Sequence, residues 1–318
     1  MKILIPMQVS DLGVNYLKDK GYEIVRPVNS TEASICEAVV DCDGLLTRTD
    51  LVTKKVITSS DKLKVVGKHG VGVDNIDLDA CMEAGVYVTN APVSNMISVA
   101  EHTMALILAL SKKIVTGCNA QKSGDHEFRS REVCADLCEK KIAIIGLGRI
   151  GSTVAKMCHL GFDMKILGYD PYIKNVADYI TMYDTIEETI KDADYISLHM
   201  PSTKENKRFF DKKYFDLMKN SACIINCARG EILNEDDLLI AIENNEIAGA
   251  GLDVFEIEPP LANNPLFKLD NVIVTPHNAA LTTESKDRMG LHAAIGIDEV
   301  LSGKKISYPV VVPNTPRK

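Results

Sequence analysis

The sequence predicts an α/β protein made of two doubly wound domains, each built on a parallel sheet. Three observations support this fold class. Short apolar runs alternate with helix-like segments along most of the chain. The length of 318 residues favours about two domains. A glycine-rich turn follows an apolar run near the middle of the chain, where a second domain would begin.

In the first 90 or so residues, strand-like and helix-like segments alternate as expected for a small strand–helix–strand domain. Segments 10–20 and 53–60 begin with capping residues and show helical spacing. Between such segments lie five apolar runs of strand length, at 2–6, 22–27, 44–48, 63–67 and 86–90. We therefore expect a doubly wound unit in this part of the chain.

A long apolar segment, 96–112, follows this unit. Its most apolar part, 96–110, contains Glu101 and His102 and is shorter than the ~18 uncharged residues typical of a membrane-spanning helix. It therefore predicts a buried helix, which leads through the polar segment 123–139 into the second domain.

The second domain is predicted to contain six strands with helices between most of them. The strand candidates are 141–145, 165–169, 195–198, 223–226, 248–252 and 272–275. A final helix over 283–301 precedes the β-branched tail 306–312. This tail is too short to fold alone, so we expect it to return and pack on the first domain.

The turn KIAIIGLGRIG (141–151) is typical of dinucleotide binding. Gly146 permits a tight strand-to-helix turn, Gly148 lets the backbone approach a pyrophosphate, and Gly151 lets the helix pack against the sheet. A second apolar run ends in Asp170, about 20 residues further on, as ribose recognition requires. The alternative is a glycine turn that binds no ligand.

Asp170 also predicts the choice of cofactor. A carboxylate at this position can bind the ribose hydroxyl groups of NAD and repels the additional 2′-phosphate of NADP. Lys174 is the only cationic residue close to Asp170 in the sequence, too little to reverse the preference. We therefore expect NAD as cofactor.

Charge and cysteine usage exclude several classes of protein. A net charge of −8 and a pI near 5.5 argue against a nucleic-acid-binding surface, which needs clustered Lys and Arg. The nine cysteines include no Cys-x-x-Cys pair, so zinc and disulfide frameworks fit poorly. With no secretory signal, they predict free thiols in a cytoplasmic protein. No metal, nucleic-acid or membrane site is expected.

Three segments of the second half supply residues for acid–base chemistry on an anionic substrate. Arg229 follows a β-like run, and an arginine fork suits a carboxylate, although a surface ion pair is the default role of an isolated arginine. His277 follows another run, and a neighbouring carboxylate would favour its protonated form. Spacing leaves open whether Glu256 or Glu258 is that carboxylate.

Taken together, these motifs resemble the D-2-hydroxyacid dehydrogenase family, and within it the short D-3-phosphoglycerate dehydrogenases that lack a regulatory domain. The resemblance covers nearly the whole chain. It rests on GVGVDNID (70–77), SVAEHT (98–103), the glycine turn, CARG (227–230), DVFE (253–256) with EPP (258–260), and PH (276–277). It implies a flavodoxin-like substrate-binding domain, 1–97 plus 294–318, and a Rossmann NAD-binding domain, 98–293.

The resemblance also implies roles for individual residues. The implied catalytic residues are Arg229, Glu258 and His277. The resemblance thus favours Glu258 over Glu256 as the carboxylate beside His277. The backbone at Val71 and Gly72 is implied to bind the substrate carboxylate. The cofactor is implied to be lined, beside the three glycines, by Arg149, Ile150, Asp170, Met200, Pro201, Cys227 and Asp253.

Two basic residues of the first domain are candidates for a substrate phosphate. Arg48 ends the third apolar run and resembles the phosphate-contacting position of phosphoglycerate dehydrogenases, although a solvated loop charge is an equal alternative. Lys68 stands where several relatives have arginine, which keeps the charge and loses the fork. Among the other histidines, His69, His102 and His199 are expected to be hydrogen-bonded structural residues. His126, His159 and His292 are expected in loops or on helix surfaces.

These interpretations predict an NAD-dependent oxidoreductase that interconverts a D-2-hydroxy acid and its 2-oxo acid. One alternative within the same chemistry is a hydroxypyruvate or glyoxylate reductase. Another, from a different class, is a non-enzymatic NAD(H)-sensing protein of the corepressor type. The resemblance further implies a homodimer joined through the cofactor domain and a helical hairpin.

Overall fold

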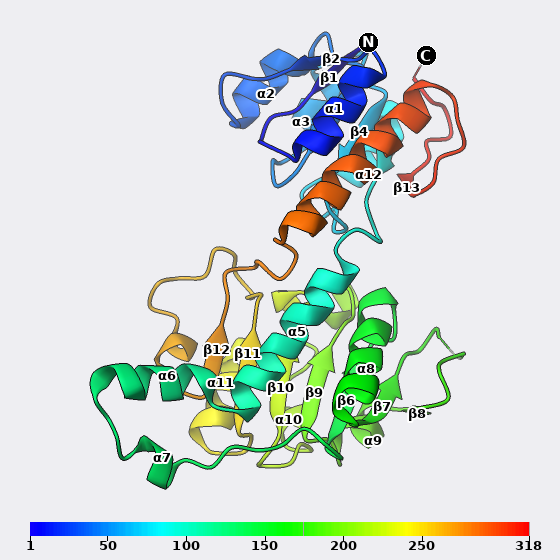
Figure 1. Cartoon of the computed structure of the whole chain (residues 1–318). Coiled ribbons are helices and arrows are strands. Elements are labelled where there is room, and N and C mark those ends of the chain that lie inside the picture. The colour runs from blue at the N-terminus through cyan, green and yellow to red at the C-terminus, as the bar shows by residue number, and fades with distance from the viewer. Residues whose placement is uncertain (174, 318) are drawn as a thin grey trace. The chain divides into compact units, whose positions relative to one another are not determined.

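The computed structural model describes residues 1–173 and 175–317 and divides the chain into two compact units (Figure 1). The first unit consists of Met1–Asn95 with Ala280–Lys318, and the second of Met96–Ala279. The fold class predicted from the sequence is confirmed, since each unit holds its own largely parallel sheet. Within each unit, the arrangement of the strands explains which side chains reach the candidate site.

The sheet of the first unit has the strand order β13-β5-β4-β3-β1-β2. Without β13 this is the 2-1-3-4-5 order of flavodoxin-like sheets. The predicted return of the tail is confirmed, because β13 pairs antiparallel with β5. The strands are β1 Lys2–Leu4, β2 Glu23–Val25, β3 Gly44–Thr47, β4 Val65–Lys68, β5 Tyr87–Thr89 and β13 Pro309–Val311.

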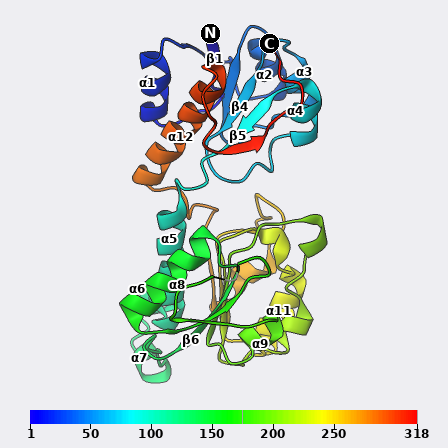
Figure 2. The same cartoon turned by 90° about the vertical axis from the view of Figure 1, so that its right-hand side faces the viewer.

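Helices cover both faces of this sheet. Helices α1 (Asp11–Asp19) and α12 (Thr283–Leu301) lie side by side and bury one apolar cluster (Figures 1 and 2). The other cluster is buried beneath α2 (Glu32–Val39), α3 (Lys54–Thr58) and α4 (Leu78–Ala84). The helices α1 to α4 each begin after a capping side chain, in keeping with the capping residues seen in the sequence.

Helix α12 corrects the domain boundary that the resemblance implied. The sequence placed the return to the first domain at residue 294, which falls inside this helix, whereas the structure places it at Ala280. The reason is the close packing of α12 on α1: a Cβ added at Gly13 would lie 2.4 Å from the Gly290 carbonyl oxygen. A continuous helix that packs along its whole length belongs to one unit.

The sheet of the second unit has the order β12-β11-β10-β9-β6-β7-β8. All of its pairings are parallel, and β8-β7-β6-β9-β10-β11 follows the Rossmann order 3-2-1-4-5-6. The six predicted strands are confirmed, and the structure adds β8. The strands are β6 Lys141–Ile145, β7 Lys165–Tyr169, β8 Ile180–Met182, β9 Tyr195–Leu198, β10 Cys223–Asn226, β11 Gly249–Leu252 and β12 Val272–Val274.

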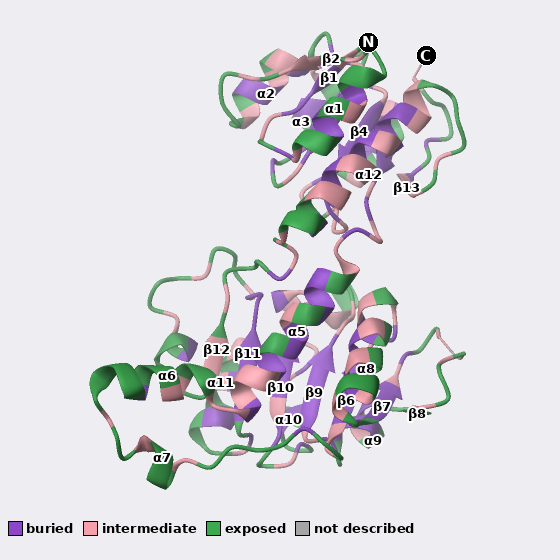
Figure 3. Ribbon diagram, in the orientation of Figure 1, coloured by how far each residue is buried: buried purple, intermediate pink, exposed green. Residues whose placement is uncertain are grey.

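The strands β6 and β9 are buried in the middle of this sheet (Figure 3). One face carries α5 (Met96–Ser111) and α8 (Arg149–Phe162), which pack on each other. Among the described residues, no helix is long and apolar enough to cross a membrane. The remaining helices are α6 Ile114–Ser123, α7 Phe128–Arg131, α9 Ile186–Ile190, α10 Lys212–Phe215 and α11 Glu235–Glu243, with short 3-10 turns at Lys204–Asn206, Gly230–Ile232 and Pro265–Lys268.

Candidate active site

The glycine turn between β6 and α8 has the geometry that dinucleotide binding requires. Gly146 has φ +97°, and a Cβ there would lie 2.7 Å from the carbonyl oxygen of His199. A Cβ at Gly151 would lie 2.0 Å from the Gly146 carbonyl oxygen, whereas a Cβ at Gly148 would meet nothing within 4 Å. Gly146 and Gly151 thus allow the close packing, and Gly148 leaves open space before the first turn of α8. The residues fit a phosphate at this helix N-terminus.

Asp170 holds this turn from the end of β7. Its side chain is buried, and its Oδ2 accepts a hydrogen bond of 2.8 Å from the Leu147 amide. The Oδ1 accepts from the amides of Tyr172 and Ile173, at 2.8 and 2.9 Å. The structure therefore shows a carboxylate that shapes the turn, and its contact with a ribose stays a prediction. Lys174 lies outside the described residues.

The other residues expected to line the cofactor differ in their surroundings. The Met200 amide lies beside the glycine turn, 3.2 Å from the position of a Cβ at Gly146. Pro201 and Arg149 are exposed and Ile150 is half-buried. Cys227 is buried, which raises the pKa of its thiol to about 12. No contact of these residues with a cofactor is tested, so their role stays a prediction.

His277 and Glu258 form the central pair of the second unit. The imidazole Nδ1 lies 2.6 Å from Glu258 Oε2, and Glu258 Oε1 accepts from the Phe255 amide at 3.1 Å. The hydrogen bond and charge of Glu258 raise the pKa of His277 above its ordinary value of 6.5. Burial would raise the pKa of Glu258, but the hydrogen bond and charge of His277 lower it overall. With Nδ1 engaged, Nε2 is the nitrogen left for proton exchange.

Asp253, at the end of β11, fixes the backbone that carries His277. Its side chain is 1% exposed, and its Oδ1 and Oδ2 accept from the amides of Asn278 and Ala279, both at 2.9 Å. Its carbonyl oxygen accepts from the His277 amide, also at 2.9 Å. His277 has φ +50°, a left-handed conformation that an L residue keeps only when its surroundings hold it. A contact of Asp253 with the cofactor stays a prediction; the structure shows it positioning the His277 loop.

Arg229 follows β10 in a loop that packs directly on the Glu258 segment. A Cβ added at Gly230 would lie 1.9 Å from the carbonyl carbon of Phe255, whose amide binds Glu258. The Arg229 guanidinium donates to the Ala228 carbonyl at 2.7 Å. Its positive charge adds to the lowering of the Glu258 pKa and partly opposes the net rise in the pKa of His277. The structure thus places Arg229 close enough to His277 and Glu258 for its charge to act on the pKa of both.

Glu256, the alternative partner of His277, is engaged elsewhere. Its Oε2 forms an ion pair of 2.9 Å with Arg208, and its Oε1 accepts from the Glu235 amide at 2.7 Å. It therefore anchors the loop between β11 and the prolines. Of the two glutamates that the spacing left open, the structure pairs Glu258 with His277.

The candidate substrate residues of the first unit lie at the end of β4 and in the loops after β3 and β4. Val71 and Gly72 are half-buried, as is Arg48. The ammonium group of Lys68 is buried and donates to the carbonyl of Arg48 and to the side chain of Asn75. Lys68 thus holds the backbone of Arg48 in place. A direct contact of either basic side chain with a substrate phosphate stays a prediction.

Three of the remaining histidines agree with their expected structural roles and one differs from its expected exposure. His102 bonds to Thr275 at 3.0 Å and His199 to Ser197 at 2.8 Å. Burial lowers the pKa of His199 and of His69 to about 4, and His69 makes backbone hydrogen bonds although its Nε2 has no partner among the described residues. His292, expected on a helix surface, is half-buried because α12 lies against the sheet.

Two functional contributions escaped the sequence reasoning. Asn226, fully buried, accepts from the Ala228 amide at 3.0 Å and donates to the Arg229 carbonyl at 2.9 Å. Thr275 donates to Asp253 at 2.6 Å. Both are polar residues at the end of an apolar run, a signal that could have marked them as holders of the site loops. Among the described residues, no group of three or more His, Cys, Asp or Glu could hold a metal ion.

The comparisons with known proteins agree with this geometry. Residues 104–279 match the sequence model described as "D-isomer specific 2-hydroxyacid dehydrogenase, NAD binding domain". The chain is 41% identical over 322 residues to the D-3-phosphoglycerate dehydrogenase of Methanocaldococcus jannaschii, covering 100% of this chain and 61% of the relative. It thus spans about three fifths of the length of that curated relative.

Solved structures extend the likeness to the whole chain. The TT0316 protein from Thermus thermophilus superposes with a TM-score of 0.89 at 30% identity, covering 98% of this chain and 100% of that one. D-lactate dehydrogenase with NAD+ from Lactobacillus jensenii superposes with a TM-score of 0.83 at 31% identity, with the same coverage. The chain therefore belongs to the D-isomer specific 2-hydroxyacid dehydrogenases, and its second unit is the NAD-binding domain of that family.

Proposed function

We propose that the protein is an oxidoreductase that interconverts a D-2-hydroxy acid and its 2-oxo acid with NAD as cofactor. The observation that carries this proposal is the His277–Glu258 pair under the charge of Arg229, at the carboxyl ends of the parallel strands of the NAD-binding domain. Ligands of doubly wound sheets bind at these strand ends.

Each residue of the set has a distinct role in the proposed reaction. The nicotinamide of the bound cofactor supplies or takes the hydride at the substrate carbon. In the reductive direction, protonated His277 donates its Nε2 proton to the carbonyl oxygen, and Glu258 stabilises the imidazolium. Arg229 polarises the carbonyl and holds the carboxylate with its planar fork. Oxidation uses the same residues in reverse, with neutral His277 as the base.

The cofactor site of the proposal consists of the glycine turn and its surroundings. The N-terminus of α8 and the open backbone at Gly148 suit the pyrophosphate, and the Asp170 carboxylate suits the ribose hydroxyl groups of NAD. Arg149, Ile150, Met200, Pro201, Cys227 and Asp253 complete the proposed lining.

For the substrate, we propose a small anionic acid whose carboxylate binds the amides of Val71 and Gly72. Arg48, with its backbone held by Lys68, is the proposed contact for a substrate phosphate. A phosphorylated acid such as 3-phosphoglycerate is therefore the first substrate to test, in keeping with the activity that names the relative from Methanocaldococcus jannaschii. Hydroxypyruvate and glyoxylate are the second substrate class.

The test is a panel of 2-oxo acids assayed by NADH and NADPH oxidation, with 3-phosphoglycerate and NAD for the reverse reaction. The proposal expects turnover of at least one acid with NADH. If Arg48 binds phosphate, kcat/KM should be higher for phosphorylated than for unphosphorylated acids. Arg48→Ala should then remove that preference and leave activity on glyoxylate unchanged. Tight NADH binding without turnover of any acid would instead favour a non-enzymatic NAD(H) sensor.

We also propose a cytoplasmic homodimer. All nine cysteines are free thiols, which suits a reducing compartment. The second unit exposes an apolar face between α5 and α8, lined by Met104, Leu108, Met157 and Phe162 among others, which suits contact with a second copy. Light scattering of the purified protein gives the oligomeric state, and a monomer at micromolar concentration would overturn this part of the proposal.

A further inference from the structure

The loop after β4 is held by two of its carbonyl groups. The carbonyl oxygen of Gly70 accepts from the Ala91 amide at 2.8 Å. The carbonyl oxygen of Val71 accepts from the Asn90 side-chain amide at 2.7 Å. Gly70 itself has φ +134°, a conformation that only glycine adopts easily, and the chain bends there. Two consecutive peptide groups of this loop are therefore tied to the end of β5.

These two bonds determine where the following amides point. In a planar trans peptide the C=O and the next N–H point in opposite directions. Fixing the carbonyls of Gly70 and Val71 toward residues 90 and 91 thus turns the amides of Val71 and Gly72 the other way. In the described part of the chain, neither amide donates a hydrogen bond to a protein group. Two adjacent free amides pointing the same way form an anion-binding concavity.

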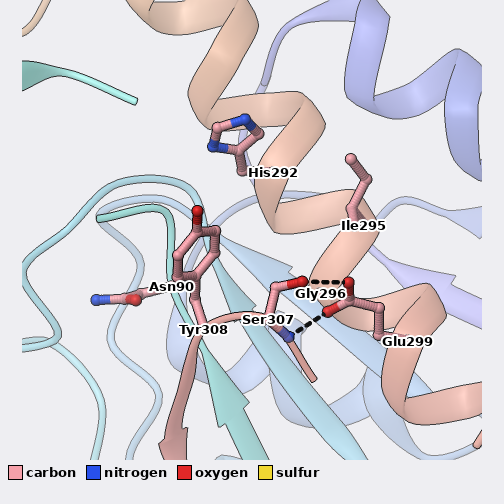
Figure 4. Close-up of a pocket in the computed structure, with 7 residues that line it drawn as sticks. All are labelled: Asn90, His292, Ile295, Gly296, Glu299, Ser307 and Tyr308. Carbon is pink, nitrogen blue, oxygen red and sulfur yellow. Dashed lines mark hydrogen bonds between the residues drawn. The ribbon is translucent and has the colours of Figure 1, made fainter. Parts of the chain in front are cut away.

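Asn90 is itself anchored by the C-terminal tail. Its backbone amide donates to the carbonyl oxygen of Tyr308 at 3.3 Å, immediately before β13 pairs with β5. Figure 4 shows Asn90 next to Tyr308 at the wall of a cavity of about 140 Å³, with its side chain extending away from the α12 residues His292 and Glu299. The side-chain amide of Asn90 instead donates to the Val71 carbonyl oxygen, and this hydrogen bond links Asn90 to the loop after β4.

We propose that Asn90 is a positioning residue that sets the affinity for the substrate carboxylate. Its side-chain amide binds the Val71 carbonyl and so orients the Gly72 amide toward the anion. The Val71 amide is oriented in the same way by the bond between Ala91 and the Gly70 carbonyl. Asn90 touches no reacting atom. This inference rests on the proposed function and adds to it the residue on which carboxylate binding depends.

The test compares two substitutions of different charge. Asn90→Leu keeps the approximate size and removes the donor, and Asn90→Asp replaces the donor by an oxygen that repels the Val71 carbonyl. We expect KM for glyoxylate to rise about fivefold in Asn90→Leu, as loss of one hydrogen bond implies, and more in Asn90→Asp, with kcat within about threefold of wild type. Kd for NADH should not change. Asn90→Gln, which keeps the donor, should recover part of the affinity.

The matched control is Asn271→Asp. The Asn271 side chain makes the same kind of bond, to the Ala248 carbonyl at 2.8 Å, but lies before β12 in the other unit. The Asn271→Asp substitution should leave KM for glyoxylate unchanged. Wild-type KM in Asn90→Leu would overturn the inference, even if Asn90→Asp raises KM, because the added negative charge alone would then explain the effect.

A second measurement needs no variant and covers the case that Asn90 variants fail to fold. Hydrogen–deuterium exchange of the wild-type protein with NADH is compared with and without saturating oxalate, a small carboxylate probe. Slower exchange at Val71 and Gly72 is expected, and unchanged exchange there at saturation overturns the inference. If the wild type reduces no 2-oxo acid, the proposed function fails. If the wild type is active and Asn90→Leu has the wild-type KM, the role of Asn90 is refuted while the proposed function stands.

Discussion

The loop that carries His277 and the loop that carries Val71 and Gly72 are held in opposite ways. In the NAD-binding unit, the buried carboxylate of Asp253 accepts two backbone amides of the His277 loop. In the first unit, the side-chain amide of Asn90 donates to a carbonyl of the Val71 loop. One loop therefore has its amide groups engaged, and the other has them free.

The difference follows from what each loop presents. The His277 loop presents a side chain, so its backbone amides are best satisfied internally, and a charged acceptor does this most strongly. The Val71 loop presents its own amides, so its carbonyls are the groups that the fold engages. The glycine turn shows both devices at once, since Asp170 accepts the Leu147 amide while the backbone at Gly148 stays open. The polarity of the residue that holds a loop thus indicates what the loop presents.

The largest effect is expected for His277→Ala, which removes the group that the first loop presents and leaves the loop itself in place. Loss of a general acid typically costs a factor of about 10²–10⁴, so kcat for 2-oxo acid reduction should fall by about 10³. Kd for NADH, measured by fluorescence titration, serves as the control and should stay close to that of wild type. A variant retaining a tenth of wild-type kcat would exclude His277 as the proton donor.

Asp253→Asn tests the way in which the first loop is held. One oxygen becomes an NH2 group that faces a backbone amide, which costs about 2 kcal/mol of stability and up to about thirtyfold in kcat. Thermal unfolding and steady-state kinetics measure both. The matched control is Asp194→Asn, which also loses a backbone amide bond, from Lys141 at 2.9 Å, but at the opposite end of the same sheet. Equal loss of kcat in the control would mean that the Asp253 effect is merely general destabilisation.

Glu258→Gln keeps the imidazole and removes the charge that raises its pKa. Reduction needs protonated His277, so kcat/KM should be highest below the raised pKa of His277 and fall as pH rises through it. In Glu258→Gln this fall should move to lower pH, with about a tenfold loss at neutral pH from the weaker hydrogen bond. A pH profile that keeps the wild-type midpoint would show that Glu258 does not control the titration.

The smallest effect is expected for Asp170→Ala in the glycine turn. Removing the carboxylate relieves repulsion of a 2′-phosphate, worth about 1 kcal/mol in water, so the preference for NADH over NADPH should fall about fivefold. Because Leu147 also loses its acceptor, Kd for NADH should rise as well. The ratio of kcat/KM for the two cofactors gives the result, and an unchanged ratio would rule out Asp170 as the source of the preference.

Much of this fold could be predicted from local patterns. The apolar runs of both sheets, the N-capped helices and the glycine turn each depend on a few neighbouring residues, and the structure confirms them. Strand β8 escaped prediction because its three residues include the polar Thr181 and it pairs with one strand only. The domain boundary at 294 was wrong because the close contact between Gly13 and Gly290 joins residues 277 positions apart, and no local pattern reports such packing.

The sequence by itself determined which elements form and which chemical groups stand at their ends: an arginine, a glutamate and a histidine after apolar runs, and glycines where the backbone must turn. Only the tertiary structure decided between Glu256 and Glu258, because the choice depends on Arg208 engaging Glu256 from 48 positions away. It also decided that Asp253 and Asn90 hold the loops, since hydrogen bonds between strand ends arise only when the parallel strands are brought into register.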